Sequence, residues 1–141
     1  MEQWPVEVLR IREASFPGRL VNFRDQNRWA DASLVTAVVG DTVVGYCFTT
    51  PGMLEASAAY VNEVAVDKAH RNHGIGELLI VAAVEWLHEV GCKKVFVDAL
   101  EGGDGERRLR WFERLGFEPH EEEMHSAGAA EFLSARRPST L

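Results

Sequence analysis

Two apolar runs rich in β-branched residues lie close together near residue 40. They cover Leu34–Val39 and Thr42–Phe48. Gly40 and Asp41 separate them, and a pair of this kind between two apolar runs favours the turn of a β-hairpin. We therefore expect two antiparallel strands here.

A third run with strand character covers Ala59–Val66. Successive side chains of a strand point to opposite faces of a sheet. The odd-numbered residues are expected on one face: Val61, Glu63 and Ala65. The even-numbered residues are expected on the other: Asn62, Val64 and Val66.

Apolar residues then follow the period of a helix from Ile75 to Val90. Their spacing of i, i+3, i+4 and i+7 makes one wide apolar stripe, which is typical of a helix on a sheet. Gly91 ends this helix, and Lys94–Ala99 has the composition of a buried strand. A helix that connects two strands of one sheet makes them parallel, so this strand and the one at Ala59–Val66 are predicted to be parallel.

The remaining elements are shorter. Apolar spacing predicts helices around residues 6–14, which include Val6, and over Leu20–Ala30. Another helix is predicted over Glu106–Leu115, followed by strands near Phe117–Met124 and Ala129–Ala135. This order of elements predicts an α/β fold with a mixed sheet and helices on its faces.

Composition and charge limit the class of protein. The chain has 141 residues, 46% apolar and 26% charged, which fits one soluble domain. No apolar run reaches the ~20 residues of a membrane span, and the start lacks the pattern of a secretory signal. We expect a cytoplasmic protein that binds no membrane.

The net charge of −7 argues against binding to nucleic acid and mildly favours a cationic partner such as an amine. A simpler interpretation is that this charge keeps the protein soluble. Cys47 and Cys92 are far apart, and Cys47 is interpreted as a small buried hydrophobe. Neither His70 nor His73 has another ligand-type residue at metal-binding spacing, so no metal is expected.

The segment Arg71–Gly76 lies between a buried strand and the first turn of the long helix. The first N–H groups of a helix have no internal partner and the helix dipole is positive there, so such a place binds phosphate. Gly74 and Gly76 would let a pyrophosphate approach the backbone. The alternative is that Gly74 only turns the chain into the helix.

Two stretches of the sequence resemble shared segments of the GNAT superfamily of N-acetyltransferases. They are "VNEVAVDKAHRNHGIGELLI", Val61–Ile80, and "RRLRWFERLGFEP", Arg107–Pro119. The resemblance extends over about Leu34–Pro119, and "REASFP", Arg12–Pro17, is weakly similar to the branch that acetylates protein N-termini. It implies a mostly antiparallel mixed sheet with a central parallel strand pair. It also implies one domain over residues 1–137, without the family's usual first strand, and a tail over 138–141.

The resemblance further implies that acetyl-CoA is the acyl donor. Backbone amides of the glycine-containing segment, together with Glu77, would hold its pyrophosphate, and the strand at Val64–Val66 would bind its pantetheine arm as an added strand. The expected cofactor-binding residues are Val64, Ala65, Val66, Arg71, Asn72, His73, Gly74, Ile75, Gly76 and Glu77.

The expected reaction transfers an acetyl group to a primary amine of a small molecule or peptide. Glu63 is the first candidate base, acting through a water, and Asp98 is the second. Glu63 could instead position a cationic substrate, and Asp98 could instead order a loop. Many family members have a Tyr, the proton donor to the thiolate, where this chain has Phe112.

That departure keeps a second function open. The chain could be a catalytically weak domain that binds acyl-CoA as a sensor or within a partner complex. Exposed strand edges near the C-terminus would also allow a homodimer.

Overall fold

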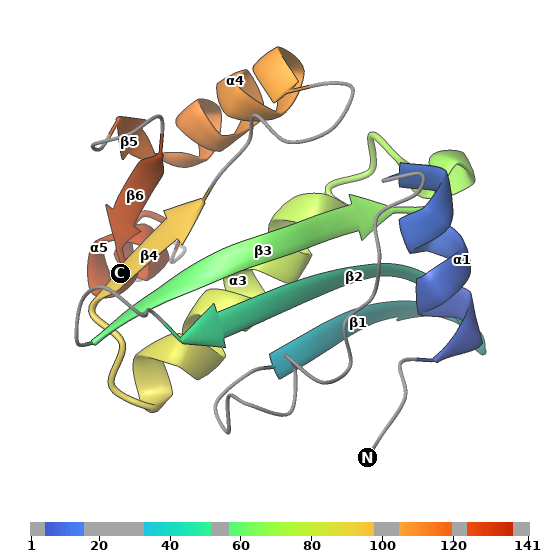
Figure 1. Cartoon of the computed structure of the whole chain (residues 1–141), viewed down its shortest axis with the longest axis horizontal. Helices are drawn as coiled ribbons and strands as arrows, with labels where there is room; N and C mark the ends of the chain where they lie inside the picture. The colour runs from blue at the N-terminus through green and yellow to red at the C-terminus, as the bar shows by residue number, and fades with distance from the viewer. Residues whose placement is uncertain (1–4, 16–32, 52–56, 98–104, 120–123, 137–141) are drawn as a thin grey trace, which may run out of the picture.

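The computed structural model describes residues 5–15, 33–51, 57–97, 105–119 and 124–136. Its centre is a six-stranded sheet in the order β1-β2-β3-β4-β6-β5 (Figure 1). Only β3 and β4 pair in parallel; the other neighbours are antiparallel. The predicted fold class is confirmed.

The strands β1, Ser33–Val39, and β2, Thr42–Pro51, form the expected hairpin. Gly40 lies in its turn with φ of 61°, a backbone conformation that glycine adopts without the steric cost of a Cβ. β2 then pairs with β3, Ala58–Val66, in the centre of the sheet.

The chain crosses from β3 to β4, Lys94–Val97, through the short helix η1, Lys68–His70, and the long helix α3, Ile75–Glu89. The crossover makes β3 and β4 parallel, as the pattern predicts. The apolar stripe of α3 packs on the sheet and buries Leu79, Ile80, Ala83, Val84 and Leu87.

Two helices join α3 in the larger core. They are α4, Gly105–Leu115, and α5, Ala129–Ser134. Along the chain, the short strands β5, Glu118–Pro119, and β6, His125–Gly128, lie between α4 and α5. The opposite face of the sheet carries α1, Val6–Ser15, which packs on β2 and β3 (Figure 1).

Three details differ from the sequence predictions. The strand predicted over Ala129–Ala135 is wrong, because this segment forms α5. Its apolar residues Ala129, Phe132 and Leu133 have the helical spacing i, i+3, i+4 and pack against the core. The second difference is in α1. Val6, one of the apolar residues that predicted this helix, is 76% exposed, whereas Val8 and Ile11 are buried. The helix predicted over Leu20–Ala30 lies outside the described residues.

The third difference is a β-bulge in β3. The pairing with β2 passes from Phe48↔Glu63 directly to Thr49↔Val61, so Asn62 is an extra residue in β3. Its side-chain amide donates a hydrogen bond to Thr50 Oγ1 at 2.6 Å.

The bulge changes the faces predicted for this strand. Val61 shares the α3 face with Val64 and Val66, whereas Ala65 packs in the cluster under α1. Regular alternation would have put Val61 beside Glu63 and Ala65. The extra residue shifts the alternation by one, so the predicted face of Val61 is wrong.

Candidate functional site

The loop before α3 exposes backbone amides at a helix start. Asn72 has φ of 67° and Gly74, the N-cap residue, has φ of 80°. No side chain caps this end of α3, and nothing lies within 4 Å of a Cβ built on Gly74. The Arg71 Nε donates a hydrogen bond to the Val66 carbonyl at 2.9 Å, which fixes the start of the loop. The first amides of α3 are therefore available to an anion.

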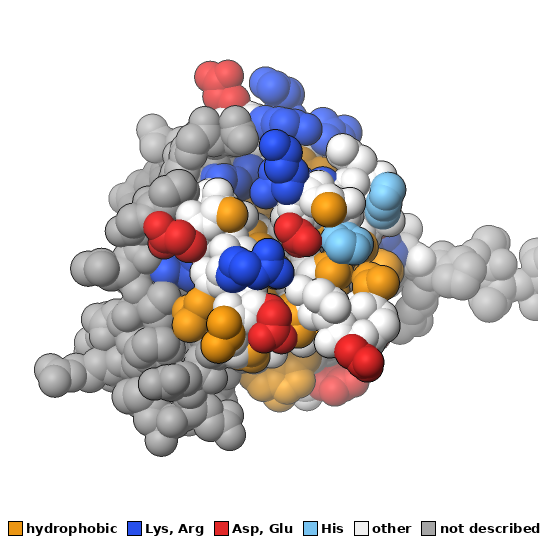
Figure 2. All heavy atoms as spheres, turned by 90° about the vertical axis from the view of Figure 1, so that its right-hand side faces the viewer, with side chains coloured by type: hydrophobic (Ala, Val, Ile, Leu, Met, Phe, Trp, Pro, Cys, Tyr) orange, Lys and Arg blue, Asp and Glu red, His pale blue; other side chains and the backbone are white. Residues whose placement is uncertain are grey.

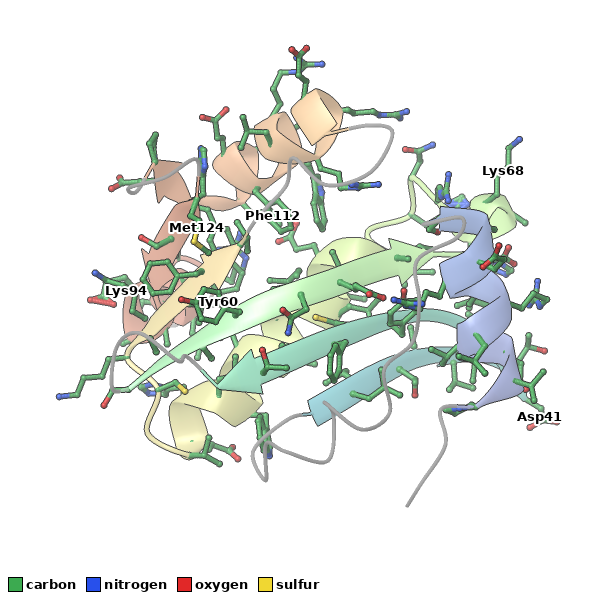
Figure 3. All side chains as sticks on the ribbon, in the orientation of Figure 1. Asp41, Tyr60, Lys68, Lys94, Phe112 and Met124 are labelled. Atoms are coloured by element: carbon green, nitrogen blue, oxygen red, sulfur yellow. The ribbon has the colours of Figure 1, made fainter. Side chains whose placement is uncertain are left out.

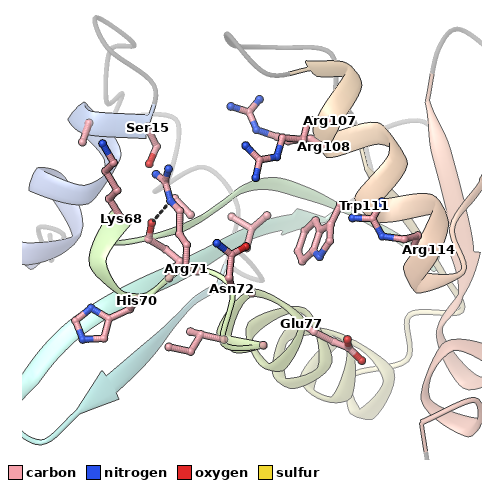
Figure 4. Close-up of a pocket in the computed structure, with 17 residues that line it drawn as sticks. Ser15, Lys68, His70, Arg71, Asn72, Glu77, Arg107, Arg108, Trp111 and Arg114 are labelled. Carbon is pink, nitrogen blue, oxygen red and sulfur yellow. Dashed lines mark hydrogen bonds between the residues drawn. The ribbon is translucent and has the colours of Figure 1, made fainter.

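A cavity of about 640 Å³ lies against this loop, between the end of α1, the end of β3 and α4 (Figure 4). It brings together nine of the ten predicted cofactor-binding residues: Val64, Ala65, Val66, Arg71, Asn72, Gly74, Ile75, Gly76 and Glu77. His73 is exposed and does not line it, whereas His70 does. Ser15 lines it too, and its buried hydroxyl has no hydrogen-bond partner among the described residues.

The cavity is cationic although the chain is acidic. Its lining includes five Lys and Arg residues: Lys68, Arg71, Arg107, Arg108 and Arg114. Figure 2, which views the molecule from the right-hand side of Figure 1, shows Lys and Arg side chains gathered in its upper part. Among the described lining residues only Glu77 is acidic, and it pairs with Arg136 at 3.3 Å. A ligand with several phosphate groups suits this charge pattern.

The described part of the parallel pair β3–β4 ends next to the cavity. β3 and β4 pair from Ala58↔Lys94 to Val61↔Val97, but β3 continues to Val66. No described strand pairs with that side of β3 beyond Val61. Its amides and carbonyls there can bind an extended ligand arm as an added strand would.

Glu63 lies on the α1 side of the sheet and is 5% exposed. Its carboxylate accepts hydrogen bonds from Arg12 Nε at 2.7 Å and the second Arg12 guanidinium nitrogen at 2.9 Å. The Tyr46 hydroxyl donates a third at 2.8 Å. These bonds connect α1, β2 and β3 through one carboxylate. The other candidate base, Asp98, lies outside the described residues.

Phe112 is 3% exposed and lies between α4 and the sheet (Figure 3). Its ring centroid is 5.0 Å from that of Trp111 and 5.5 Å from that of Phe117. Phe117 in turn lies 5.4 Å from Phe132 of α5. Phe112 is therefore part of a row of aromatic rings, and its side chain has no proton to donate.

Cys47 is fully buried, as predicted, and burial raises the pKa of its thiol to about 12. A thiol with this pKa stays protonated at neutral pH and is a poor nucleophile. Among the described residues, no three His, Cys, Asp or Glu side chains are grouped to hold a metal ion.

Several lining residues were not predicted as site residues. They include Arg107, Arg108, Trp111 and Arg114 of α4. The helical spacing of Arg107, Trp111 and Arg114, at i, i+4 and i+7, puts them on one side of α4. That spacing was visible in the sequence, but the position of α4 beside the loop was not.

The glycine-containing loop at the start of α3 lies next to the end of the parallel pair β3–β4, in the arrangement that the sequence resemblance implies. The model of the Acetyltransferase (GNAT) family matches residues 2–117. The chain therefore belongs to this family.

Similar proteins include an enzyme sequence and several solved structures of similar fold. Glucosamine 6-phosphate N-acetyltransferase from Trypanosoma brucei brucei is 29% identical over 120 residues, which cover 74% of this chain and 72% of the relative. The KacTA–DNA complex has a TM-score of 0.65 at 19% identity, over 90% of this chain and 82% of that chain. A mutant AtaT toxin bound to the C-terminus of the antitoxin AtaR and acetyl-CoA has a TM-score of 0.55 at 22% identity, over 67% and 65%.

The expectation that nucleic acid is excluded as a partner is wrong. It rested on the net charge of −7, but a chain of this fold occurs in a complex with DNA, and another with an antitoxin segment. Net charge describes the whole surface, and a local patch or a bound partner can carry the contacts instead. A separate finding is that none of the described helices is long and apolar enough to span a membrane.

Proposed function

We propose that the protein is an N-acetyltransferase that transfers the acetyl group of acetyl-CoA to a primary amine. The observation that carries the proposal is the cationic cavity at the open start of α3, next to the unpaired side of β3. Backbone donors, positive side chains and a free strand edge match the diphosphate, the 3′-phosphate and the amide-containing arm of CoA. A cytoplasmic location stays a prediction.

In this proposal, the amides from Asn72 to Glu77 bind the pyrophosphate. The arginines of α4 supply further positive charge to the phosphates. The pantetheine arm lies along β3 at Val64–Val66 and directs the thioester to the place where β3 and β4 separate. The arm thereby fixes the acetyl group in one place relative to an incoming amine.

The chemistry is a direct displacement. The lone pair of a neutral amine attacks the thioester carbonyl carbon, and the carbonyl oxygen becomes an oxyanion that a strand amide near Val64 stabilises. The C–S bond then breaks, the carbonyl re-forms and CoA leaves as a thiolate. The attacking nitrogen passes one proton to a water, with Glu63 as the proposed base. A thiol with a reference pKa of ~8.5 leaves without a strong acid, so Phe112 slows the reaction without preventing it.

The acceptor is proposed as a small molecule or peptide with a primary amine. The name of the trypanosomal relative adds amino-sugar phosphates to the candidates. An acceptor panel therefore contains glucosamine 6-phosphate, free polyamines and peptides with free N-termini. Acetylated product is detected by mass spectrometry together with the release of free CoA.

A second function has its own support in Phe112, whose buried apolar position provides no general acid. It is a domain that binds acyl-CoA as a sensor or in a partner complex. The two functions differ in turnover. Tight binding of acetyl-CoA, with no product from any acceptor in the panel, supports the second function and overturns the first.

The donor site is tested by Gly74→Glu. The variant places a carboxylate at the proposed pyrophosphate site, so we expect acetyl-CoA affinity to fall by roughly 100-fold, measured by calorimetry. Gly91→Glu is the matched control, because Gly91 also has positive φ and open surroundings but lies at the other end of α3. Equal affinities in the two variants would place the pyrophosphate elsewhere.

A further inference from the structure

The first turn of α3 is in tight contact with α4 at one point. A Cβ built on Gly76 would lie 3.0 Å from Trp111 Cζ2 and 3.3 Å from Trp111 Cη2. Both distances are shorter than nine in ten real Cβ contacts, so a side chain at Gly76 would require the indole to shift by a few tenths of an ångström. The same construction on Gly74 meets nothing within 4 Å. The two glycines of the loop therefore have different surroundings.

Trp111 also lines the cavity, on the same side of α4 as Arg107 and Arg114 (Figure 4). A rigid helix passes any shift of Trp111 on to its neighbours one turn away. The separation between α3 and α4 at Trp111 therefore sets where the arginines of α4 lie relative to the loop.

A second set of contacts leads from α4 back to the first turn of α3. From Trp111 the aromatic row continues through Phe112 and Phe117 to Phe132. The guanidinium of Arg136 lies 3.8 Å from the centroid of the Phe132 ring and also pairs with Glu77, the neighbour of Gly76. The contacts form a closed circuit that starts and ends on the first turn of α3 and passes through α4 and α5.

We propose that Trp111 is a positioning residue for the acyl donor. Its indole, admitted by the missing side chain of Gly76, fixes the spacing between α3 and α4 and directs the α4 arginines at the phosphates. The role of Gly76 is then to accept Trp111 rather than to let the pyrophosphate approach. This inference rests on the proposed function, since it assigns residues to the same donor site.

A double-mutant cycle separates the two roles of Gly76. The atoms nearest to the added methyl group, Cζ2 and Cη2, belong to the six-membered ring of the indole, and Phe lacks them. We expect Gly76→Ala to weaken acetyl-CoA binding at least fivefold, a value at the lower end of overpacking effects. Trp111→Phe alone should weaken it by less than about threefold, because an aromatic contact is kept.

The decisive measurement is the Gly76→Ala/Trp111→Phe double variant. Its affinity should return to within about twofold of Trp111→Phe alone, because the methyl group fills the space that the smaller ring leaves. In turnover assays, Gly76→Ala should raise the KM for acetyl-CoA with little change in kcat, because the phosphates are remote from the reacting carbon. Loss of stability alone would not produce this split.

Gly74→Ala serves as the control, because its Cβ strains the backbone without touching Trp111. Its effect on affinity should be the same with Trp111 or Phe at position 111. The inference is overturned if Gly76→Ala weakens binding by the same factor in both backgrounds, since the pyrophosphate itself would then need Gly76. If the unmodified protein does not bind acetyl-CoA, the proposed function fails instead.

Discussion

Glu63 is the residue whose surroundings change its interpretation most. A general base needs an oxygen that can accept a proton, and the Glu63 carboxylate already accepts three hydrogen bonds from Arg12 and Tyr46. A carboxylate so engaged orders its surroundings, and it can act on the amine through a water only at an oxygen that keeps room for one. Its catalytic role stays a proposal.

Glu63→Gln tests that role. We expect kcat to fall more than the affinity for acetyl-CoA, whether Glu63 is a base or orders the acceptor side, because the donor cavity does not include it. Loss of the ion-pair partner of the buried Arg12 should also lower the free energy of unfolding by roughly 3 kcal/mol. Tyr46→Phe, which removes one hydrogen bond and no charge, is the comparison. A large fall in donor affinity with unchanged kcat would assign Glu63 to the cofactor.

Phe112→Tyr tests whether the usual acid of the family can be restored. The Phe112 ring is enclosed by Trp111 and Phe117, so an added hydroxyl would be buried in an apolar row. We expect the variant to lose about 1–3 kcal/mol of unfolding free energy and to gain no kcat, measured by chemical denaturation and steady-state kinetics. A tenfold gain in kcat at unchanged stability would show that the ring reaches the thiolate.

At the scale of elements, hydrophobic periodicity predicted most of the fold. The hairpin, α3 and the parallel pair follow from patterns of two and 3.6 residues. The bulge at Asn62 could not be read from the sequence, because Val61, Val64 and Val66 are apolar on either side of it. The mistaken strand at Ala129–Ala135 shows that a short apolar run does not distinguish a strand from a helix.

The loop of the site was predicted for a related reason. Its proposed binding of phosphate depends on local backbone geometry, which Gly74 and the start of α3 indicate. The cationic wall of α4 depends instead on how two distant elements pack, and the sequence does not show that packing. The sequence shows the arginines of α4 but not that they point toward the loop.

The variant Gly45→Ala tests how tightly β2 packs against α3. A Cβ built there would lie 3.0 Å from the Ala65 carbonyl oxygen and 3.1 Å from Leu79 Cδ1. We expect Gly45→Ala to lower the free energy of unfolding by about 1–3 kcal/mol through overpacking, measured by urea denaturation. The exposed Thr36 on β1 provides a control, and Thr36→Ala should have a much smaller effect. Equal effects would mean that α3 can move away at little cost.

At the scale of the whole molecule, charge is unevenly distributed. The chain carries a net charge of −7, yet one cavity has five Lys and Arg residues in its lining. An anionic ligand is therefore attracted locally by a protein that repels anions on average. Net charge alone therefore does not predict which ligands a local surface can attract.

Salt should reveal this local attraction. We expect a rise from 0.05 to 0.5 M NaCl to weaken acetyl-CoA binding by roughly tenfold, because screening shortens the reach of the cavity charges. An acetyl thioester of pantetheine, which lacks the nucleotide phosphates, is the control and should bind with little dependence on salt. Identical salt dependence for the two ligands would show that the basic residues do not contact phosphate.

The unpaired side of β3 has a consequence for how this protein can change over generations. Whatever lies along that edge is recognised by peptide groups, and every residue except proline offers the same two. Side chains there can be exchanged without altering the pattern of donors and acceptors. Under the proposed function, the strand can thus acquire preferences for new acceptors on its faces while its edge continues to hold the same donor.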